Sequence, residues 1–279
     1  MIPLSRFPMA KLAYRGETLR LEVLAHGVVR LVLARPSVRN AINAAMIAES
    51  EELFAWLDDH GQESRLLLLQ GEGEVFCGGA DLTYMRVQAL VTEEENLKDA
   101  RRLGRFFHRI AASPVPVVCH VQGAALGGGL GLAACSDFVL AQASAVFATP
   151  EVRLGLVAGV IGPYVVRRLG LAHAAPLLLT GARVNAREAH RAGLVQRVVE
   201  RTEDAEDALT LVLQCFLQGG PQAVRRTREL LRLLAPLPGP ELIEASVQAL
   251  ARVRVAEEAR VGLKARFSKD LPPWAKDLP

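Results

Sequence analysis

Residues 120–137 read His120-Val121-Gln122-Gly123-Ala124-Ala125-Leu126-Gly127-Gly128-Gly129-Leu130-Gly131-Leu132-Ala133-Ala134-Cys135-Ser136-Asp137. Five of the nine residues from 123 to 131 are glycines, and they lie between an apolar segment and a segment typical of a helix. Glycine has no Cβ to block a ligand, and the first N–H groups of a helix have no partner within it. Because these donors lie at the positive end of the helix dipole, we expect an oxygen that carries or develops negative charge to bind here.

A purely structural explanation of these glycines is equally open, since glycine also permits tight turns and close helix packing. Nucleotide binding is a weaker interpretation. The sequence has no G-x-x-x-x-G-K-[ST] pattern, and no G-x-G-x-x-G in a βαβ unit followed by an acidic residue. The segment therefore indicates an anion site or a turn, and not a phosphate loop.

The composition is that of a folded globular protein. The chain has 279 residues, of which 51% are hydrophobic and 23% charged, and its formal net charge is +3. One segment is basic, through Arg225, Arg226, Arg228 and Arg232. On a helix such arginines more often form a solvated face than a nucleic-acid site, so we do not expect nucleic acid as a partner.

Cysteine usage and the N-terminal segment bear on the cellular location. The scattered cysteines, Cys77, Cys119, Cys135 and Cys215, lie in apolar settings without metal-ligand spacing, so we expect buried free thiols and no metal. Residues 1–15 lack the continuous apolar core of a signal peptide. A membrane-spanning helix needs about eighteen consecutive apolar residues, and the sequence contains no such stretch free of charged residues. We therefore expect a cytoplasmic protein with no membrane partner.

Strand and helix patterns alternate along the first two thirds of the chain. Leu19–Val23 and Val28–Leu33 predict a hairpin. Helical patterns follow at 40–59, 92–112 and 129–135, and they alternate with strand patterns at 66–69, 115–121 and 138–141. Such alternation favours parallel strands joined by crossover helices. The predicted fold class is therefore α/β.

Beyond Val199 only helical patterns remain. They cover residues 203–217, 221–234 and 240–267 and are separated by glycine and proline. We therefore expect a core over 12–200 and a C-terminal helical region over 201–267. Residues 1–11 and 268–279 are expected to be flexible tails.

A second glycine-containing turn follows the strand at 66–69. Gly78 and Gly79 precede a predicted helix start, so this turn also offers free backbone N–H groups. Two such turns on neighbouring strands can direct one donor each at a single oxygen, as in an oxyanion hole. Asp81 follows the turn, where a role as helix cap is favoured over a role as catalytic acid.

Glu151 is the strongest candidate for proton transfer. It lies in the largely apolar segment 146–156, where desolvation favours the neutral carboxyl and raises its pKa. The structural alternatives are a salt bridge to Arg153 or a helix N-terminal glutamate. His108 and His120 are expected to be hydrogen-bonded structural residues, and Asp137 is expected to be structural as well.

Three of these segments together resemble a known family. Residues 76–82, 122–129 and 150–156, in this order and spacing, are similar to the motifs of the crotonase superfamily of enoyl-CoA hydratases and isomerases. The early segment 35–43 extends the likeness, which covers about residues 19–199. The resemblance implies a crotonase-like spiral of ββα turns, with C-terminal helices that form a homotrimer or homohexamer. It also implies an acyl-CoA thioester substrate, with CoA as part of the substrate and no separate cofactor.

The resemblance also assigns roles to individual residues. The thioester oxygen is expected on the N–H groups of Ala80 and Gly128, with Glu151 as the catalytic acid or base. The substrate-binding positions it implies are Val38, Arg39, Asn40, Ala41, Ala80, Asp81, Leu82, Thr83, Gly127 and Gly128.

One position departs from the family pattern. Hydratases with two catalytic glutamates carry the first where this chain has Gly131, so the resemblance favours a hydratase that uses Glu151 alone. Bacterial methylglutaconyl-CoA hydratase-like proteins look most similar, which suggests a branched acyl group. The alternatives are a double-bond isomerase, a dehydratase of a 3-hydroxy-3-methylglutaryl thioester on CoA or a carrier protein, and a non-catalytic binder of acyl-CoA or RNA.

Overall fold

The main sheet has seven strands in the order β1-β2-β3-β4-β5-β7-β10. The computed structural model describes residues 4–276, so residues 1–3 and 277–279 of the predicted tails lie outside the described part. The strands are β1 Met9–Arg15, β2 Leu19–Leu24, β3 Val28–Leu33, β4 Leu66–Gly71, β5 Val117–Val121, β7 Phe138–Gln142 and β10 Arg197–Val199. β1, β2 and β3 pair antiparallel, and all pairs from β3 to β10 are parallel. The predicted hairpin and the parallel α/β core are confirmed.

A second sheet contains three short strands, which the sequence patterns did not reveal. They are β6 Ala124–Leu126, β8 Val146–Ala148 and β9 Val184–Asn185, in the order β6-β8-β9. Each has two or three residues, too few for alternation to show. β6 leads directly into the second half of the glycine run, and β8 precedes Glu151. This small sheet therefore holds two of the candidate segments next to each other.

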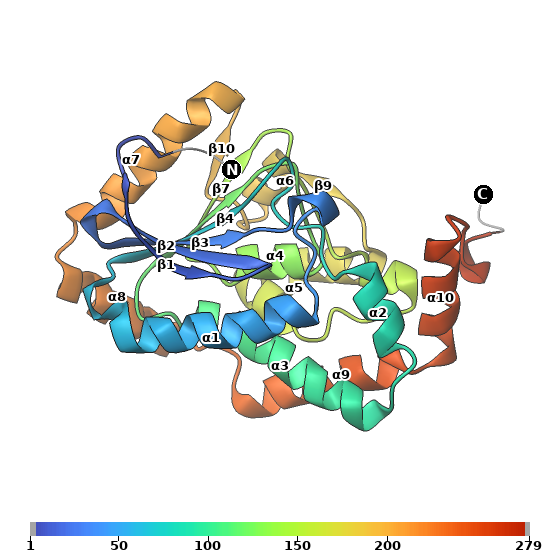
Figure 1. Cartoon of the computed structure of the whole chain (residues 1–279). Coiled ribbons are helices and arrows are strands. Elements are labelled where there is room, and N and C mark those ends of the chain that lie inside the picture. The colour runs from blue at the N-terminus through green and yellow to red at the C-terminus, as the bar shows by residue number, and fades with distance from the viewer. Residues whose placement is uncertain (1–3, 277–279) are drawn as a thin grey trace.

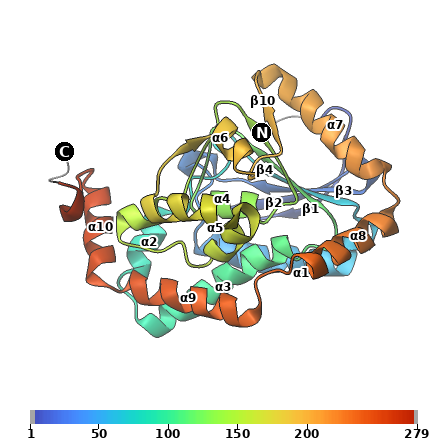
Figure 2. The same ribbon diagram turned by 180° about the vertical axis from the view of Figure 1, so that it is seen from behind.

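Within residues 4–276, ten α-helices are present. They lie around the sheets (Figures 1 and 2). They are α1 Ala44–His60, α2 Leu82–Gln88, α3 Glu93–Ala111, α4 Gly128–Ala134, α5 Gly162–Thr180, α6 Ala186–Arg191, α7 Ala205–Gln218, α8 Pro221–Leu234, α9 Pro240–Arg254 and α10 Glu257–Phe267. The single helix expected over 240–267 is instead two helices, α9 and α10, because the chain turns at Val255 and Ala256. This turn directs α10 back toward the segment that carries Glu151.

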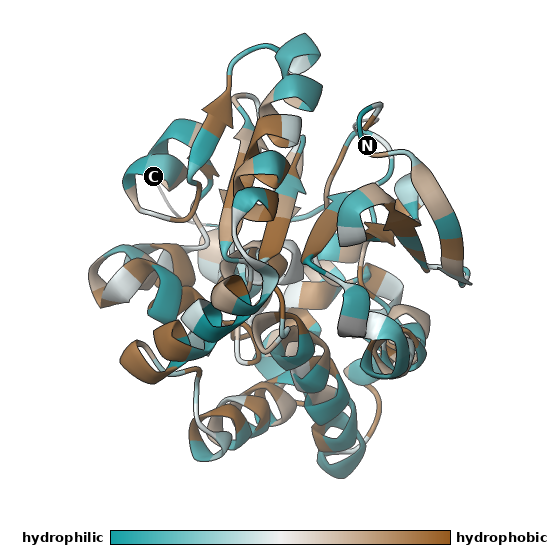
Figure 3. Ribbon diagram, turned by 90° about the vertical axis from the view of Figure 1, so that its left-hand side faces the viewer, coloured by the Kyte–Doolittle hydropathy of each residue, from teal (hydrophilic) through white to brown (hydrophobic). Residues whose placement is uncertain are grey.

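Two apolar clusters cover the two faces of the main sheet. Leu67 and Leu69 point to the face packed by α1, α3 and α4, and Leu66 and Leu68 point to the face covered by α7. Side chains alternate along a strand, so a fully apolar run serves both faces at once. In Figure 3 the strands of the main sheet are largely in the apolar colour, whereas the helices alternate between apolar and polar colours.

The ends of the described chain are more ordered than the sequence suggests. Leu4 and Phe7 are buried against α7, and Met9–Arg15 forms the edge strand β1. At the other end, a 3-10 turn covers Pro273–Ala275, and Lys276 pairs with Asp270 at 2.9 Å. Residues 4–11, expected as part of a tail, therefore contribute two buried side chains and the start of the edge strand β1.

The arginines of α8 are not simply a solvated face. Arg228 is buried, and its Nε donates to Asp137 Oδ2 at 2.8 Å. Asp137 Oδ2 also accepts from the backbone N–H of Val117 at 2.7 Å, which confirms its structural role. Arg225 donates to Ser64 O at 2.6 Å, so α8 is fixed to the core by polar contacts.

The cysteine prediction holds for three of the four residues. Cys77, Cys119 and Cys135 are buried free thiols, whereas Cys215 is exposed. Cys215 lies on α7, a helix with one face on the sheet and the other in solvent, and an apolar sequence neighbourhood does not show which face a residue occupies.

Candidate active site

The turn at 78–81 lies between two segments that are distant in the sequence. Ile42 N donates to Gly79 O at 2.8 Å, and Asp81 N donates to Ile42 O at 2.8 Å. In this parallel bridge the residues on either side of Ala80 make the hydrogen bonds, so the N–H of Ala80 points away from Ile42. Within the described residues, no backbone oxygen accepts this N–H.

The second turn leads into α4 and abuts the first. Gly127 has φ +48° and ψ −116°, a conformation open to glycine and costly for other residues. Gly128 begins α4, so its N–H has no partner within that helix. A Cβ on Gly79 would lie 2.9 Å from Leu126 O, so the two turns touch. Ala80 and Gly128 line one common cavity.

Glu151 lines the same cavity, from the 3-10 turn Pro150–Leu154 that follows β8. Its Oε1 lies 2.8 Å from the point where a Cβ on Gly127 would be, and its Oε2 is buried without a hydrogen-bond partner among the described residues. The alternative of a salt bridge to Arg153 is wrong, because Arg153 Nε donates to Thr180 O at 3.0 Å. Burial raises the pKa of Glu151 to about 7. At neutral pH this carboxyl is therefore poised to take up or give a proton.

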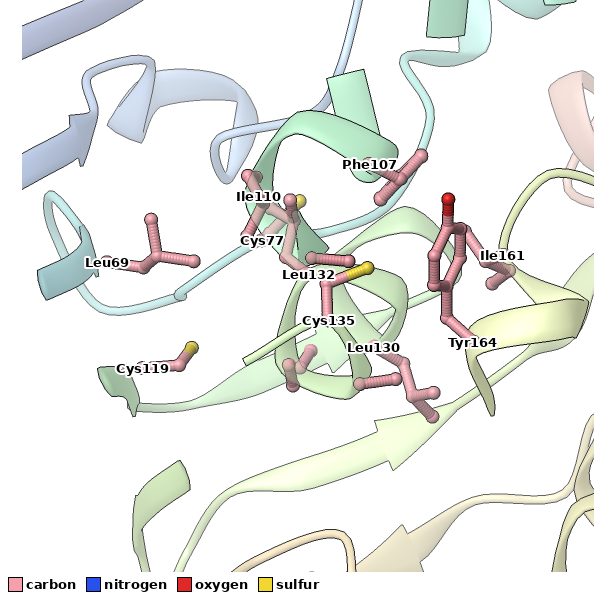
Figure 4. Packing of buried hydrophobic residues seen from close by; sticks show 14 of the residues in the cluster. Leu69, Cys77, Phe107, Ile110, Cys119, Leu130, Leu132, Cys135, Ile161 and Tyr164 are labelled. Carbon is pink, nitrogen blue, oxygen red and sulfur yellow. The ribbon is translucent and has the colours of Figure 1, made fainter. Parts of the chain in front are cut away.

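Apolar side chains occupy the space beside Gly131. A Cβ at this position would lie 2.4 Å from Ile161 Cγ2 and 3.0 Å from Phe107 Cε1. Figure 4 shows Phe107 and Ile161 beside the helix that carries Leu130 and Leu132. A second acid at position 131 would have no room, and Glu151 is the one carboxylate among the described residues that line the cavity.

A wider groove adjoins this cavity, and Ala80 and Glu151 line both. The groove is also lined by most of the predicted substrate-binding residues, namely Val38, Arg39, Ala41, Asp81, Leu82, Thr83 and Gly127. Asp81 confirms its predicted role as a cap, since its Oδ1 accepts from Thr83 N at 2.9 Å at the start of α2. Its Oδ2 pairs with Arg35 at 3.1 Å, which fixes the turn further.

Among the predicted substrate-binding residues, Asn40 lines neither the groove nor the cavity. It is fully buried, and its Nδ2 donates to Glu72 O and Val75 O, each at 2.8 Å. Its Oδ1 accepts from Arg35 N at 2.8 Å. Asn40 is therefore a structural residue that shapes the loop 35–41, and its assignment to substrate binding is corrected.

Several lining residues were assigned no functional role from the sequence. Three further arginines line the groove together with Arg39, and they are Arg153, Arg183 and Arg266. Tyr84, Arg254 and Leu263 line the cavity beside Glu151. Only the tertiary packing of α9 and α10 brings Arg254, Leu263 and Arg266 to the site, so no local sequence signal announced them.

The packing of α10 against the Glu151 turn depends on two glycines. A Cβ on Gly155 would lie 2.6 Å from Glu258 O, and a Cβ on Gly262 would lie 2.3 Å from Leu154 O. These contacts allow the backbones of α10 and the 3-10 turn to approach each other closely. α10 therefore forms a wall of the candidate site.

The two histidines expected to be structural differ in their contacts. His108 Nδ1 lies 3.4 Å from the hydroxyl of Tyr164. His120 is fully buried on β5, and neither of its ring nitrogens has a hydrogen-bond partner among the described residues. Burial lowers the pKa of His120 to about 3, so it is neutral. The expectation that His120 is hydrogen-bonded is wrong, and neither histidine lines the cavity of Glu151.

Comparison with known proteins identifies the family. The profile of the enoyl-CoA hydratase/isomerase family matches residues 24–277. The chain belongs to this family. Human enoyl-CoA hydratase domain-containing protein 2, mitochondrial, is 36% identical over 217 residues, which are 75% of this chain and 73% of that protein. Mevalonyl-coenzyme A hydratase sidH of Aspergillus fumigatus is 32% identical over 253 residues, 88% of this chain and 91% of that protein.

Solved structures place this enoyl-CoA hydratase/isomerase family member in the crotonase superfamily. An enoyl-CoA hydratase from Shewanella pealeana superposes with a TM-score of 0.74 at 34% identity, covering 92% of this chain and 96% of that one. The predicted superfamily and fold are therefore confirmed. In residues 4–276, no helix combines the length and apolarity needed to span a bilayer.

Proposed function

We propose that this family member is a hydratase-type lyase that adds water to, or removes it from, the 2,3 double bond of an acyl-CoA thioester. One observation carries the proposal: the Glu151 carboxyl is buried, without a hydrogen-bond partner at Oε2, in the cavity that Ala80 and Gly128 also line. An acid or base and two backbone donors are the groups that this reaction needs. CoA enters as part of the substrate, and no further cofactor is required.

In the proposed mechanism Glu151 first accepts a proton and later donates the same proton. Its carboxylate takes a proton from water while the water oxygen bonds to C3, and the electrons of the 2,3 double bond shift toward the thioester carbonyl. The N–H groups of Ala80 and Gly128 hold the resulting enolate oxygen. Glu151 then returns the proton to C2. The product has gained the elements of one water molecule, and the carboxylate is regenerated.

A double-bond isomerase is the second candidate, and the surroundings of Gly131 favour it. Isomerisation needs one carboxyl, which removes a proton from one carbon and returns it to another. The apolar contacts of Ile161 and Phe107 at position 131 leave no place for a second acid that would hold water. Several relatives carry both activities in their names, among them an enoyl-CoA isomerase/hydratase of Zymoseptoria tritici.

Product analysis separates the two reactions. The enzyme is incubated with a 2-enoyl-CoA and, separately, with a 3-enoyl-CoA in water enriched in oxygen-18. We expect the heavy oxygen in a 3-hydroxyacyl product from the 2-enoyl thioester. Conversion of the 3-enoyl to the 2-enoyl thioester without any labelled 3-hydroxy product would replace the hydratase with the isomerase. If neither thioester reacts and both bind, the protein is a non-catalytic binder.

We propose more specifically that the substrate carries a branched acyl group. It draws on the likeness to methylglutaconyl-CoA hydratase-like sequences and on the similarity to a protein named mevalonyl-coenzyme A hydratase. Dehydration of a 3-hydroxy-3-methylglutaryl thioester, on CoA or on a carrier protein, is the same reaction in reverse. Comparing kcat/KM for branched and linear thioesters of equal length, on CoA and on a carrier, tests this choice.

We further propose that the enzyme assembles as a homotrimer or a pair of trimers through its C-terminal helices. α8 exposes four leucines, Leu230, Leu231, Leu233 and Leu234, with between 52% and 78% of each accessible in the single chain. Exposed apolar side chains grouped in this way favour burial against another protein surface. A second copy of this chain is the occupant that the family resemblance implies.

A further inference from the structure

Hydration requires a water molecule held beside C3, and Glu151 by itself gives that water only one partner. A water molecule inside a protein typically makes about three hydrogen bonds to polar groups. Among the described residues that line the cavity of Glu151, two others carry an oxygen or nitrogen in the side chain, and they are Tyr84 and Arg254. Any second side-chain contact to the water therefore comes from one of these two residues.

The hydroxyl of Tyr84 is held in a fixed orientation. Tyr84 is the buried residue of α2, and its hydroxyl donates to Asp99 Oδ2, since an ionised carboxylate only accepts. Arg254 donates from Nη1 to the same Asp99 oxygen at 2.7 Å, and its side chain is also hydrogen-bonded to Tyr84. A guanidinium only donates, so the Tyr84 oxygen is the acceptor in that bond. The proton of the hydroxyl therefore points to Asp99, and its oxygen is an acceptor toward other groups.

Of the two candidates, Tyr84 suits an attacking water and Arg254 does not. A water that donates one hydrogen to the Glu151 carboxylate and the other to the Tyr84 oxygen keeps its lone pairs free for C3. Arg254 has no acceptor, so it could contact the water only through those lone pairs. That contact would oppose the attack on C3.

A structural tie between helices is the alternative explanation of this network. Asp99 lies on α3 and Arg254 on α9, so the ion pair and the Tyr84 hydroxyl join α2, α3 and α9. A group that only holds the helices together supports every reaction of the site equally. A group that holds the water supports hydration alone, and this difference can be measured.

We propose that Tyr84 is a water-positioning residue, whose oxygen accepts a hydrogen bond from the water that Glu151 activates. Asp99 and Arg254 are positioning residues that orient the hydroxyl. This inference rests on the proposed function and adds a residue to it. Tyr84 transfers no proton, because the proton of the water passes to Glu151 and then to C2.

The test compares two reactions of four-carbon thioesters in Tyr84→Phe. One is hydration of 2-butenoyl-CoA, and the other is exchange of the C2 protons of butyryl-CoA in heavy water, which needs Glu151 and the two N–H groups but no water at C3. We expect kcat/KM for hydration to fall by about tenfold, as the loss of one hydrogen bond in the transition state implies. The exchange rate is expected to stay within about twofold, since the groups that form the enolate are intact.

Tyr164→Phe is the matched control. Tyr164 is also a buried tyrosine, its hydroxyl lies 3.4 Å from His108 Nδ1, and it does not line the cavity of Glu151. This variant is expected to change neither hydration nor exchange. An equal loss of both reactions in Tyr84→Phe, or undiminished hydration, would overturn the inference and leave the hydratase intact.

Failure of the proposed function is visible in the natural enzyme alone. A natural enzyme that exchanges the C2 protons and adds no water to 2-butenoyl-CoA is not the proposed hydratase, and the inference falls with it. If Tyr84→Phe does not fold, a crystal structure of the natural enzyme with butyryl-CoA decides. An ordered water within hydrogen-bond distance of both Glu151 and the Tyr84 hydroxyl is expected there. A site without such a water would overturn the inference.

Discussion

Glu151 combines three properties that its sequence neighbourhood alone did not establish. Its carboxyl is buried, its Oε2 has no hydrogen-bond partner among the described residues, and its Oε1 occupies the space that a Cβ on Gly127 would need. Burial raises the pKa of Glu151, because it outweighs the opposing effect of a hydrogen bond from the residue's own backbone N–H. A carboxyl with a pKa near neutrality is suited to both halves of a proton transfer.

Replacing Glu151 by glutamine is expected to abolish most of the activity. The amide cannot take up a proton, and loss of a general acid or base typically costs about 10²–10⁴ in kcat. Steady-state turnover of a 2-enoyl-CoA is the measurement. Glu63→Gln, on an exposed glutamate, is the control and should leave kcat unchanged. Full activity of Glu151→Gln with every thioester tried would show that another group transfers the proton.

The pH dependence of kcat/KM should follow the pKa of Glu151. The carboxylate is the form that accepts a proton, from water in hydration and from C2 in dehydration. We therefore expect kcat/KM to rise with pH through about 7 and to level off above it. A profile measured with a single thioester in constant ionic strength tests this. A flat profile between about pH 5 and about pH 8 would contradict the assignment, since the pKa governs the fraction of active enzyme.

The same pKa predicts a stability effect with a definite sign. The pKa is raised from 4.5 to about 7 on folding, so the folded protein holds a proton that the unfolded chain releases between these values. The free energy of unfolding therefore falls as pH rises through this range, by up to about 3 kcal/mol at about 1.4 kcal/mol per pH unit. Glutamine does not titrate, so the free energy of unfolding of Glu151→Gln does not fall in this way. The variant should therefore be more stable than the natural protein at about pH 8, but not at about pH 4. Urea unfolding at both values measures the difference, and equal stability at about pH 8 would contradict a buried carboxyl.

At the scale of elements, the packing around α4 leaves no space for an acidic side chain at position 131. Gly131 on α4 faces Ile161 and Phe107 with no space for a Cβ. Gly131→Ala is expected to cost about 1–3 kcal/mol of unfolding free energy by overpacking. Adding Ile161→Ala removes the closest contact, so the double variant should cost less than the sum of the single ones. Urea unfolding of the three variants is the measurement, and strict additivity would show that the two positions do not touch.

The contact between α10 and the Glu151 turn is a second element-scale feature. Gly262→Ala would place a Cβ 2.3 Å from Leu154 O, so α10 must move away from the turn. Because this contact supports the wall of the cavity, we expect lower thermal stability and a lower kcat/KM. Gly239→Ala is a matched control, since a Cβ there meets nothing within 4 Å. Equal losses in the two variants would show that the α10 contact has no special role.

At the scale of the whole molecule, the exposed leucines of α8 predict self-association. Leu233 and Leu234 are 78% and 72% exposed in the single chain. Replacing both with glutamate should disrupt the assembly, because charges are strongly disfavoured in the core of an interface. Light scattering after size-exclusion chromatography measures the mass. Leu90→Glu, at an equally exposed leucine after α2, is the control. A monomeric natural protein would contradict the proposed trimer.

How far the sequence predicted the site depends on the range of the interactions involved. The glycine turns and the cap at Asp81 were predictable because each depends on residues close by in the chain. Asn40 was misassigned because its partners, Glu72 and Val75, lie more than thirty positions away. Arg254 went unnoticed for the same reason, since α9 meets the cavity through contacts with α2 and α3.

The sequence by itself determined the fold class, the family and the two glycine turns, because alternating strand and helix patterns and glycine conformations are local properties. Tertiary structure alone decided that Ala80, Gly128 and Glu151 share one cavity and that Ile161 fills the space beside Gly131. It also placed a buried arginine on the wall of that cavity. The physical reason is that desolvation and close packing depend on which distant segments meet. The glycine run at 123–131 predicts a turn, and the packing of Phe107 and Ile161 leaves no room beside Gly131 for a second acid.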